Sequence, residues 1–214
     1  MDEILPGIWH WTAPNPGIGG TLVASLWLDA PGVLIDPLLP DDVGIDWFAA
    51  RPTPPLAVAL ANRHHFRSSG EVRERFGAEV FVPALGLHEF SDRGPVTSYS
   101  PGDALPGGLV PFTVGSLSPD DGGFHLGSAS ALWLADTVVR STVDPESEIG
   151  FVPDFLMDDP GETKRGLLAA FTRLLDEYEF EHLLLAHGLP LIGNGRSELE
   201  RLVRDGGRTA AGAF

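Results

Sequence analysis

The chain contains no cysteine among its 214 residues, and Lys164 is its only lysine. Without cysteine the protein has no disulfide, no thiolate nucleophile and no cysteine-ligated zinc site. Any metal site must therefore be built from histidine, aspartate and glutamate side chains.

Positive charge and long apolar runs are also scarce. The formal net charge of −16 produces a field that repels polyanions, which predicts that neither nucleic acid nor an anionic membrane surface is a partner. No stretch approaches the roughly 18 consecutive apolar residues of a membrane-spanning helix. The chain starts with Met1-Asp2-Glu3, which is acidic where a secretory signal would be basic. Together these absences predict a cytoplasmic protein.

Glycine and proline, by contrast, are abundant. The 26 glycines and 19 prolines are scattered between apolar runs, and 43% of the residues are hydrophobic. This composition is typical of a turn-rich folded protein rather than a disordered one. We expect a single domain over residues 1–214, with residues 206–214 as a frayed tail.

The pattern of apolar runs and turn signals predicts a mixed α/β protein. Strands are expected at residues 8–11 (a sheet edge), 21–29, 33–36, 56–61, 79–83, 108–114, 124–127, 131–136 and 182–188. Helices are expected at residues 41–50, around His88, and from the capping signals Ser68–Glu71, Asp159 and Ser197–Glu200, with Asp41 or Asp42 capping the first.

Three of the expected strands end in polar side chains that can carry chemistry. The run "LAN" leads into His64 and His65, "LWLAD" ends at Asp136, and "LLLAH" ends at His187. Because the ends of neighbouring strands meet at one edge of a sheet, we expect these side chains to converge. Asp36, which ends the run "VLID", is interpreted as a structural residue that holds the adjacent loop.

In order and spacing, these segments resemble the metallo-β-lactamase-fold superfamily of mostly hydrolytic metalloenzymes. The resemblance covers nearly the whole chain, from "VLIDP" through residues 56–70, "PGDALPGG" and "LWLADT" to "LLLAHG". It implies an α/β fold of the four-layer αββα sandwich type. It also implies a small-molecule substrate or ligand.

The metal-binding motif of that superfamily is degenerate in this sequence. Its H-x-H-x-D-H pattern falls on Arg63, His65, Arg67 and Ser68, so His65 alone is retained, and its next histidine would fall near Ser116 or Leu117. The resemblance matches the bridging aspartate to Asp136 and the last histidine to His187. These three residues would hold at most one divalent ion, either zinc, manganese or iron.

Two catalytic interpretations remain open. With one metal bound to His65, Asp136 and His187, an activated water would attack an ester, thioester or amide carbonyl. Without metal, His65 or His187 would act as general base while Arg63 or Arg67 stabilises an oxyanion. Because guanidinium groups oppose a bound cation, the arginines favour the metal-free site.

The polar residues around these groups are expected to contact the substrate, namely Asn62, His64 and Ser68. A non-enzymatic alternative is a binding or regulatory protein of the same fold. In that case Arg63 and Arg67 would replace the metal charge and hold a small anion such as a carboxylate or phosphate.

Overall fold

The first β-sheet contains seven strands in the order β1-β2-β3-β4-β5-β6-β7. The computed structural model describes residues 1–40 and 43–210. The strands are β1 (Asp2–Leu5), β2 (Ile8–Asn15), β3 (Thr21–Leu28), β4 (Val33–Ile35), β5 (Ala57–Ala59), β6 (Glu79–Pro83) and β7 (Thr97–Tyr99). Neighbours are antiparallel from β1 to β4 and parallel from β4 to β7. The strands expected at residues 21–29 and 33–36 are therefore confirmed, and they form an antiparallel pair.

A second sheet has the order β13-β10-β9-β8, and a two-stranded ribbon joins β11 to β12. The strands are β8 (Leu109–Thr113), β9 (Gly122–Leu126), β10 (Ala131–Leu134), β11 (Val138–Val139), β12 (Gly150–Phe151) and β13 (His182–Leu185). Because β10 pairs in parallel with β13, the residues that follow these two strands leave the sheet at the same edge.

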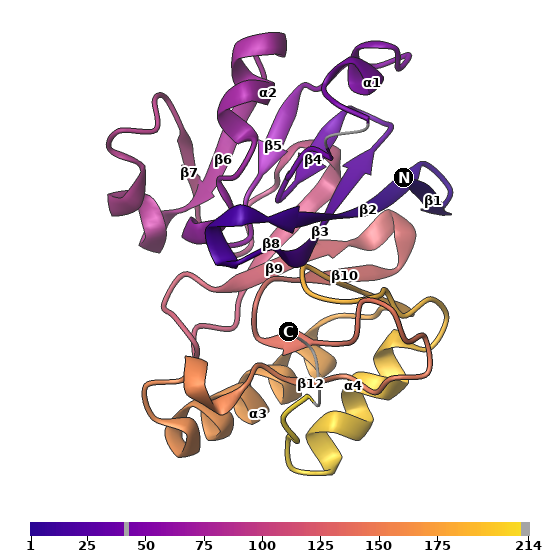
Figure 1. The fold of residues 1–214 in the computed structure, drawn as a ribbon. Coiled ribbons are helices and arrows are strands. Elements are labelled where there is room, and N and C mark those ends of the chain that lie inside the picture. Colours follow the sequence, from indigo (N-terminus) through magenta and orange to yellow (C-terminus); the bar gives the residue numbers. More distant parts are fainter. Residues whose placement is uncertain (41–42, 211–214) are drawn as a thin grey trace.

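Helices cover the outer face of each sheet (Figure 1). They are α1 (Asp46–Ala49), α2 (Ser69–Phe76), α3 (Pro160–Glu177) and α4 (Gly195–Arg204). Val72 of α2 packs in one cluster with Val58 and Val80 of the first sheet. Leu167 and Phe171 of α3 pack with the second sheet in another cluster. The predicted four-layer αββα sandwich is confirmed.

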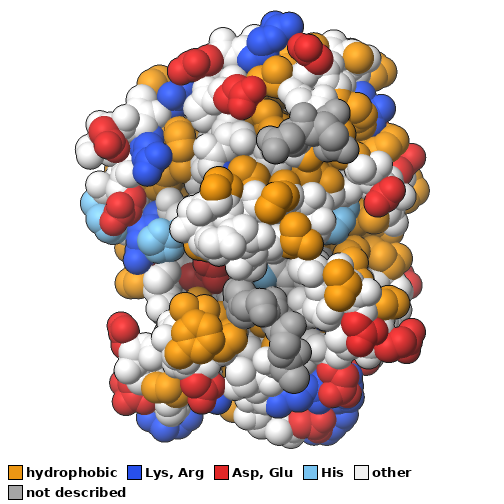
Figure 2. Space-filling model, in the orientation of Figure 1, with side chains coloured by type: hydrophobic (Ala, Val, Ile, Leu, Met, Phe, Trp, Pro, Cys, Tyr) orange, Lys and Arg blue, Asp and Glu red, His pale blue; other side chains and the backbone are white. Residues whose placement is uncertain are grey.

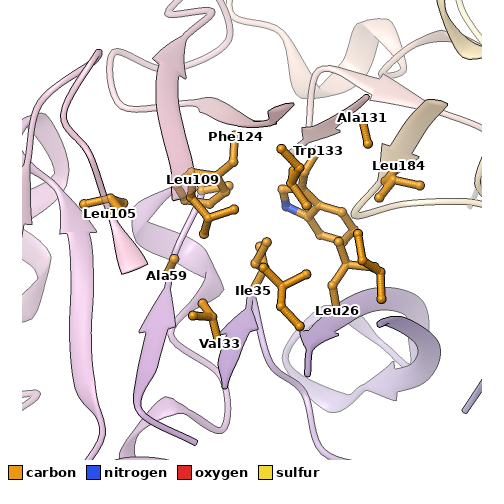
Figure 3. Close-up of a cluster of buried hydrophobic side chains, with 14 of the residues drawn as sticks. Leu26, Val33, Ile35, Ala59, Leu105, Leu109, Phe124, Ala131, Trp133 and Leu184 are labelled. Carbon is orange, nitrogen blue, oxygen red and sulfur yellow. The ribbon is translucent and has the colours of Figure 1, made fainter. Parts of the chain in front are cut away.

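The two sheets pack face to face, and the side chains between them form a buried core. Figure 3 shows Ile35 and Leu26 of the first sheet pointing toward Trp133 and Phe124 of the second. Trp133 is fully buried, and its indole N–H donates to Asp36 Oδ2 at 2.7 Å. The Trp133 side chain therefore fills the core and also holds the carboxylate of Asp36 in place.

Several local predictions are wrong at the ends of elements. Residues 8–11 do not form an edge strand, because β1 pairs outside β2, and β2 continues through Pro14 to Asn15. The helix expected around His88 is the 3₁₀ helix η3 (Ala84–Phe90), and the strand β7 follows it where no strand was expected. The first helix covers only Asp46–Ala49, and its expected caps at Asp41 or Asp42 lie outside the described residues.

The expected capping boxes differ from the structure in detail. Ser68 makes no cap hydrogen bond, since its hydroxyl accepts instead from Leu39 N at 3.0 Å. The last helix begins two residues before Ser197, whose hydroxyl donates to Asn194 O. Only Asp159 acts as predicted, with its carboxylate accepting from Glu162 N at 2.9 Å.

Residues 206–210 are not a frayed tail. Phe151 N donates to Arg208 O at 2.8 Å, and Ala210 N donates to Phe151 O at 3.0 Å. This segment therefore pairs with β12, while residues 211–214 lie outside the described part of the chain. Within residues 1–40 and 43–210, no helix combines the length and the hydropathy that a bilayer crossing requires.

Candidate active site

The loop after β5 begins with a single 3₁₀ turn, η2 (Arg63–His65). Asn62 caps this turn, because its Oδ1 accepts from His64 N at 2.9 Å. The turn directs His65 inward, where it is 3% exposed, and leaves Arg63 and His64 on a cavity wall. The adjacent histidines therefore have different environments.

His65, Asp136 and His187 form one cluster, as the strand-end argument predicts. Asp136 Oδ1 lies 3.0 Å from His65 Nε2 and 3.1 Å from His187 Nε2. All three ligand atoms lie within 4.8 Å of one another. Because each residue follows a different strand, the packing of the two sheets assembles the cluster.

Asp36 contacts this cluster through the His65 side chain. Its Oδ2 lies 2.9 Å from His65 Nδ1, and its Oδ1 accepts from Ala61 N at 2.8 Å. Burial and the Arg67 guanidinium lower the pKa of His65, but the carboxylates of Asp36 and Asp136 outweigh them and raise it to about 9. In the absence of a metal, His65 is therefore an imidazolium between two carboxylates at neutral pH.

Asp136 is held by an amide as well as by the two imidazoles. Asn62 Nδ2 donates to Asp136 Oδ2 at 2.7 Å and to Asp121 Oδ1 at 3.2 Å. Burial raises the pKa of Asp136, but His65 and His187 hold it well below its usual range. Asn62 thus orients the carboxylate rather than facing a substrate.

Asp120 and Asp121 are site residues that sequence reasoning missed, because "SPDDGG" has the composition of a turn. Both are buried, and Asp121 lies on the cavity wall. Burial and the nearby Asp136 raise the pKa of Asp121. Two consecutive acids directly before the apolar strand β9 were the available signal, since buried carboxylates need a partner.

Neither Arg63 nor Arg67 forms an ion pair with Asp136 in the described part of the chain. In residues 1–40 and 43–210, the ion-pair partners of Asp136 are the two histidines. The Arg63 guanidinium pairs with Asp120. Arg67 does not line the cavity, and its Nη1 donates to Ala24 O at 3.1 Å and to Asp36 O at 2.8 Å.

These contacts correct two expected roles. Arg67 is buried among backbone carbonyls, so it cannot reach a substrate oxyanion from its position in the structure. Ser68 likewise does not line the cavity, because its hydroxyl holds Leu39 at a separate hollow of the surface. The anion-binding alternative, which required Arg63 and Arg67 together, loses one of its two guanidinium groups.

The cluster opens into a cavity of ≈ 530 Å³. Its polar wall carries Arg63, His64, Asp121, Asp136 and His187, together with Thr21 and Ser118, and its apolar wall carries Ile18, Leu117, Val152, Phe155 and Leu156. Figure 2 shows acidic and histidine side chains recessed in the middle of this face, with hydrophobic side chains above and below. A volume of this size suits a small-molecule ligand.

The donor set fits one metal ion. Two imidazole nitrogens and one carboxylate oxygen are ligands that zinc, manganese and iron accept, and three protein ligands are usual for a catalytic zinc. In the described part of the chain, no other group of three His, Asp or Glu side chains is arranged in this way. Residues 1–40 and 43–210 therefore do not provide a second complete site.

Comparison of the sequence with family models and with curated proteins finds no match. Solved structures match in fold. A metallo-β-lactamase from Pontibacter korlensis superposes with a TM-score of 0.69 at 17% identity, over 95% of this chain and 98% of that one. A metallo-β-lactamase family protein from Thermus thermophilus gives 0.66 at 18% identity, over 95% and 80%.

A third structure, of a protein in a di-iron-bound form, gives a TM-score of 0.59 at 20% identity over 91% of both chains. At these identities the likeness establishes the fold. The chain therefore has the metallo-β-lactamase fold, as the resemblance implied.

Proposed function

We propose that this protein is a hydrolase-like member of its fold class with a reduced metal site, which holds one divalent ion at His65, Asp136 and His187. Its substrate is a small molecule with an ester, thioester or amide bond. The observation that carries this proposal is the converging donor set, with Asp36 behind His65.

The contact between Asp36 and His65 is the feature that favours a metal over a purely structural cluster. A metal-ligating histidine almost always donates its second ring N–H to a carboxylate or carbonyl, which fixes the ring and its tautomer. His65 has such a carboxylate beside it, since its Nδ1 lies 2.9 Å from Asp36 Oδ2, and its Nε2 faces Asp136. The neighbour solved in a di-iron-bound form supports the same interpretation.

The remaining cavity residues have roles that follow from their positions. A bound divalent ion would supply Lewis-acid activation of water and of a carbonyl. Arg63, which Asp120 holds in place, donates to the oxygen on which negative charge develops. His64 lines the same cavity and donates a proton to the leaving atom from its imidazole. Asn62 keeps Asp136 in its orientation.

Metal content tests the first half of the proposal. The protein is purified without added metal or chelator, and zinc, manganese and iron are measured by mass spectrometry. We expect about one equivalent per chain, which His187→Gln loses and His64→Gln retains, because His64 lies outside the donor cluster. We also expect EDTA to lower the melting temperature of the wild type. Absence of metal together with no EDTA effect would sink the single-metal site.

Hydrolysis tests the second half. The wild-type protein is assayed with p-nitrophenyl, thioester and anilide substrates, and His187→Gln is assayed alongside. We expect at least one class to be cleaved by the wild type and not by the variant. If the protein contains metal but cleaves none of these substrates, the result would contradict the hydrolase and favour a binding protein. A small-molecule ligand and a cytoplasmic location remain predictions of the sequence.

A further inference from the structure

Three large apolar side chains stand exposed around the mouth of the catalytic cavity. Ile18 belongs to the 3₁₀ turn η1 (Pro16–Ile18), and Phe155 and Leu156 belong to η6 (Asp154–Leu156). They are 47%, 79% and 49% exposed, respectively, and all line the cavity. Leu117 and Val152 continue this apolar wall inward. Exposed apolar side chains clustered at one opening mark a binding surface more often than scattered ones do.

Among the residues that line the cavity, the one guanidinium, that of Arg63, is already paired inside the protein, while the carboxylates of Asp121 and Asp136 lie on the same wall. Arg63 pairs with Asp120, and Asp136 pairs with the two histidines. The net charge of −16 also repels an anionic ligand from the opening. An uncharged ligand with an apolar group therefore suits this cavity better than a carboxylate or a phosphate.

We propose that the substrates are uncharged acyl compounds whose apolar acyl chain lies against Ile18, Phe155 and Leu156 while the carbonyl reaches the polar wall. This inference rests on the proposed hydrolase and specifies its substrate class. Burying one methylene is worth about 0.8 kcal/mol, so affinity rises about fourfold for each carbon placed in the mouth.

Binding is measured first, because it does not depend on turnover. The probes are 2-butanone, 2-hexanone and 2-octanone, which are uncharged and cannot be hydrolysed, and the readout is calorimetry. We expect affinity to increase with chain length. Phe155→Ser and Ile18→Ser should flatten the series. The matched control is Val143→Ser, because Val143 is 81% exposed but does not line the cavity. A flat series in the wild type, or equal flattening in the control, would overturn the inference.

Turnover is measured second, with p-nitrophenyl acetate, butyrate, hexanoate and octanoate. We expect kcat/KM to increase along the series in the wild type and in Val143→Ser, but not in Phe155→Ser. An ester of equal length that ends in a carboxylate should be cleaved at least tenfold less efficiently, and equal cleavage would overturn the preference for uncharged substrates.

The two measurements separate failure of the inference from failure of the proposed function. Length-dependent ketone binding without cleavage of any ester, thioester or anilide would support the apolar subsite and contradict the hydrolase. If kcat/KM does not change with chain length and the ketones bind with equal affinity, the result would support the hydrolase and contradict the apolar subsite.

Discussion

At the scale of single residues, Asp36 links the core to the site. Its carboxylate faces His65, and it also accepts from Ala61 N and the Trp133 indole. We expect Asp36→Asn to lower zinc affinity 10- to 100-fold, the usual cost of losing such a partner. We also expect it to lower the pKa of His65 in the metal-free protein, because one of the two carboxylates that raise it is gone. Zinc titration and NMR titration of the ring measure the two effects.

Trp133→Phe is the matched control for this variant. It removes one hydrogen bond to Asp36 but leaves the carboxylate against His65. The control should lose stability, by about 1–3 kcal/mol for the unsatisfied buried acceptor, and keep its zinc affinity and the pKa of His65. Equal losses of zinc affinity in both variants would show that Asp36 acts only through general stability.

At the scale of elements, the segment after α4 closes the sandwich over β12. Gly206 and Gly207 both have left-handed backbone, with φ of +79° and +74°. A Cβ on Gly207 would overlap the ring of Phe151, whereas a Cβ on Gly206 meets nothing within 4 Å. Since both substitutions carry the same left-handed strain of about 1 kcal/mol, Gly207→Ala should cost about 1–3 kcal/mol more than Gly206→Ala.

Urea unfolding of the two glycine variants measures this difference. Equal destabilisation would mean that Arg208 and Ala210 do not hold the segment against Phe151. The comparison therefore tests whether residues 206–210 are an ordered part of the second half of the sandwich, which their composition does not suggest.

The helices and strands also indicate how much of the structure the sequence predicts. Apolar runs and turn residues predicted most strands, and the residues at their ends predicted the convergence of His65, Asp136 and His187. The partners of long polar side chains could not be predicted in this way. Arg67 reaches Ala24 O, which is 43 positions away in the sequence, and Arg63 reaches Asp120, which is 57 positions away. Local periodicity carries no information on such contacts, so neither partner was predicted.

The roles of Ser68, Asp120 and Asp121 could not be predicted for a related reason. Ser68 has a sequence context that fits a helix cap, yet the backbone of Leu39 takes its hydroxyl. Asp120 and Asp121 lie in a segment with turn composition, but packing against the loop at Asn62 buries them. In each case a tertiary contact replaced the local interaction that the sequence pattern favours.

At the scale of the whole molecule, the surface charge and one buried histidine affect the stability in acid in opposite directions. Lowering the pH protonates surface carboxylates and reduces the repulsion that goes with a net charge of −16. His10 acts in the opposite direction. It is 6% exposed, and burial lowers its pKa from 6.5 to about 4, although Asp2 on the neighbouring strand β1 raises it.

Because the folded-state pKa of His10 lies below its unfolded value, the unfolded chain binds the proton more tightly. Stability is therefore full above pH 6.5 and is lost as the pH falls from about 6.5 to about 4. The loss attributable to His10 approaches about 3 kcal/mol at the acid end. His10→Phe keeps a buried ring and removes the titration, so its unfolding free energy should decline less between pH 7 and pH 4.5 than that of the wild type.

The control is His88→Phe, because the His88 side chain is 65% exposed, and it should follow the wild-type curve. Comparing pH dependence rather than absolute stability removes any constant packing cost of the larger ring at position 10. Parallel curves for wild type and His10→Phe would contradict the neutral, buried state of this histidine. A reduced loss confined to His10→Phe would show that one side chain of β2, which does not line the cavity of the candidate site, contributes to the acid sensitivity of the whole fold.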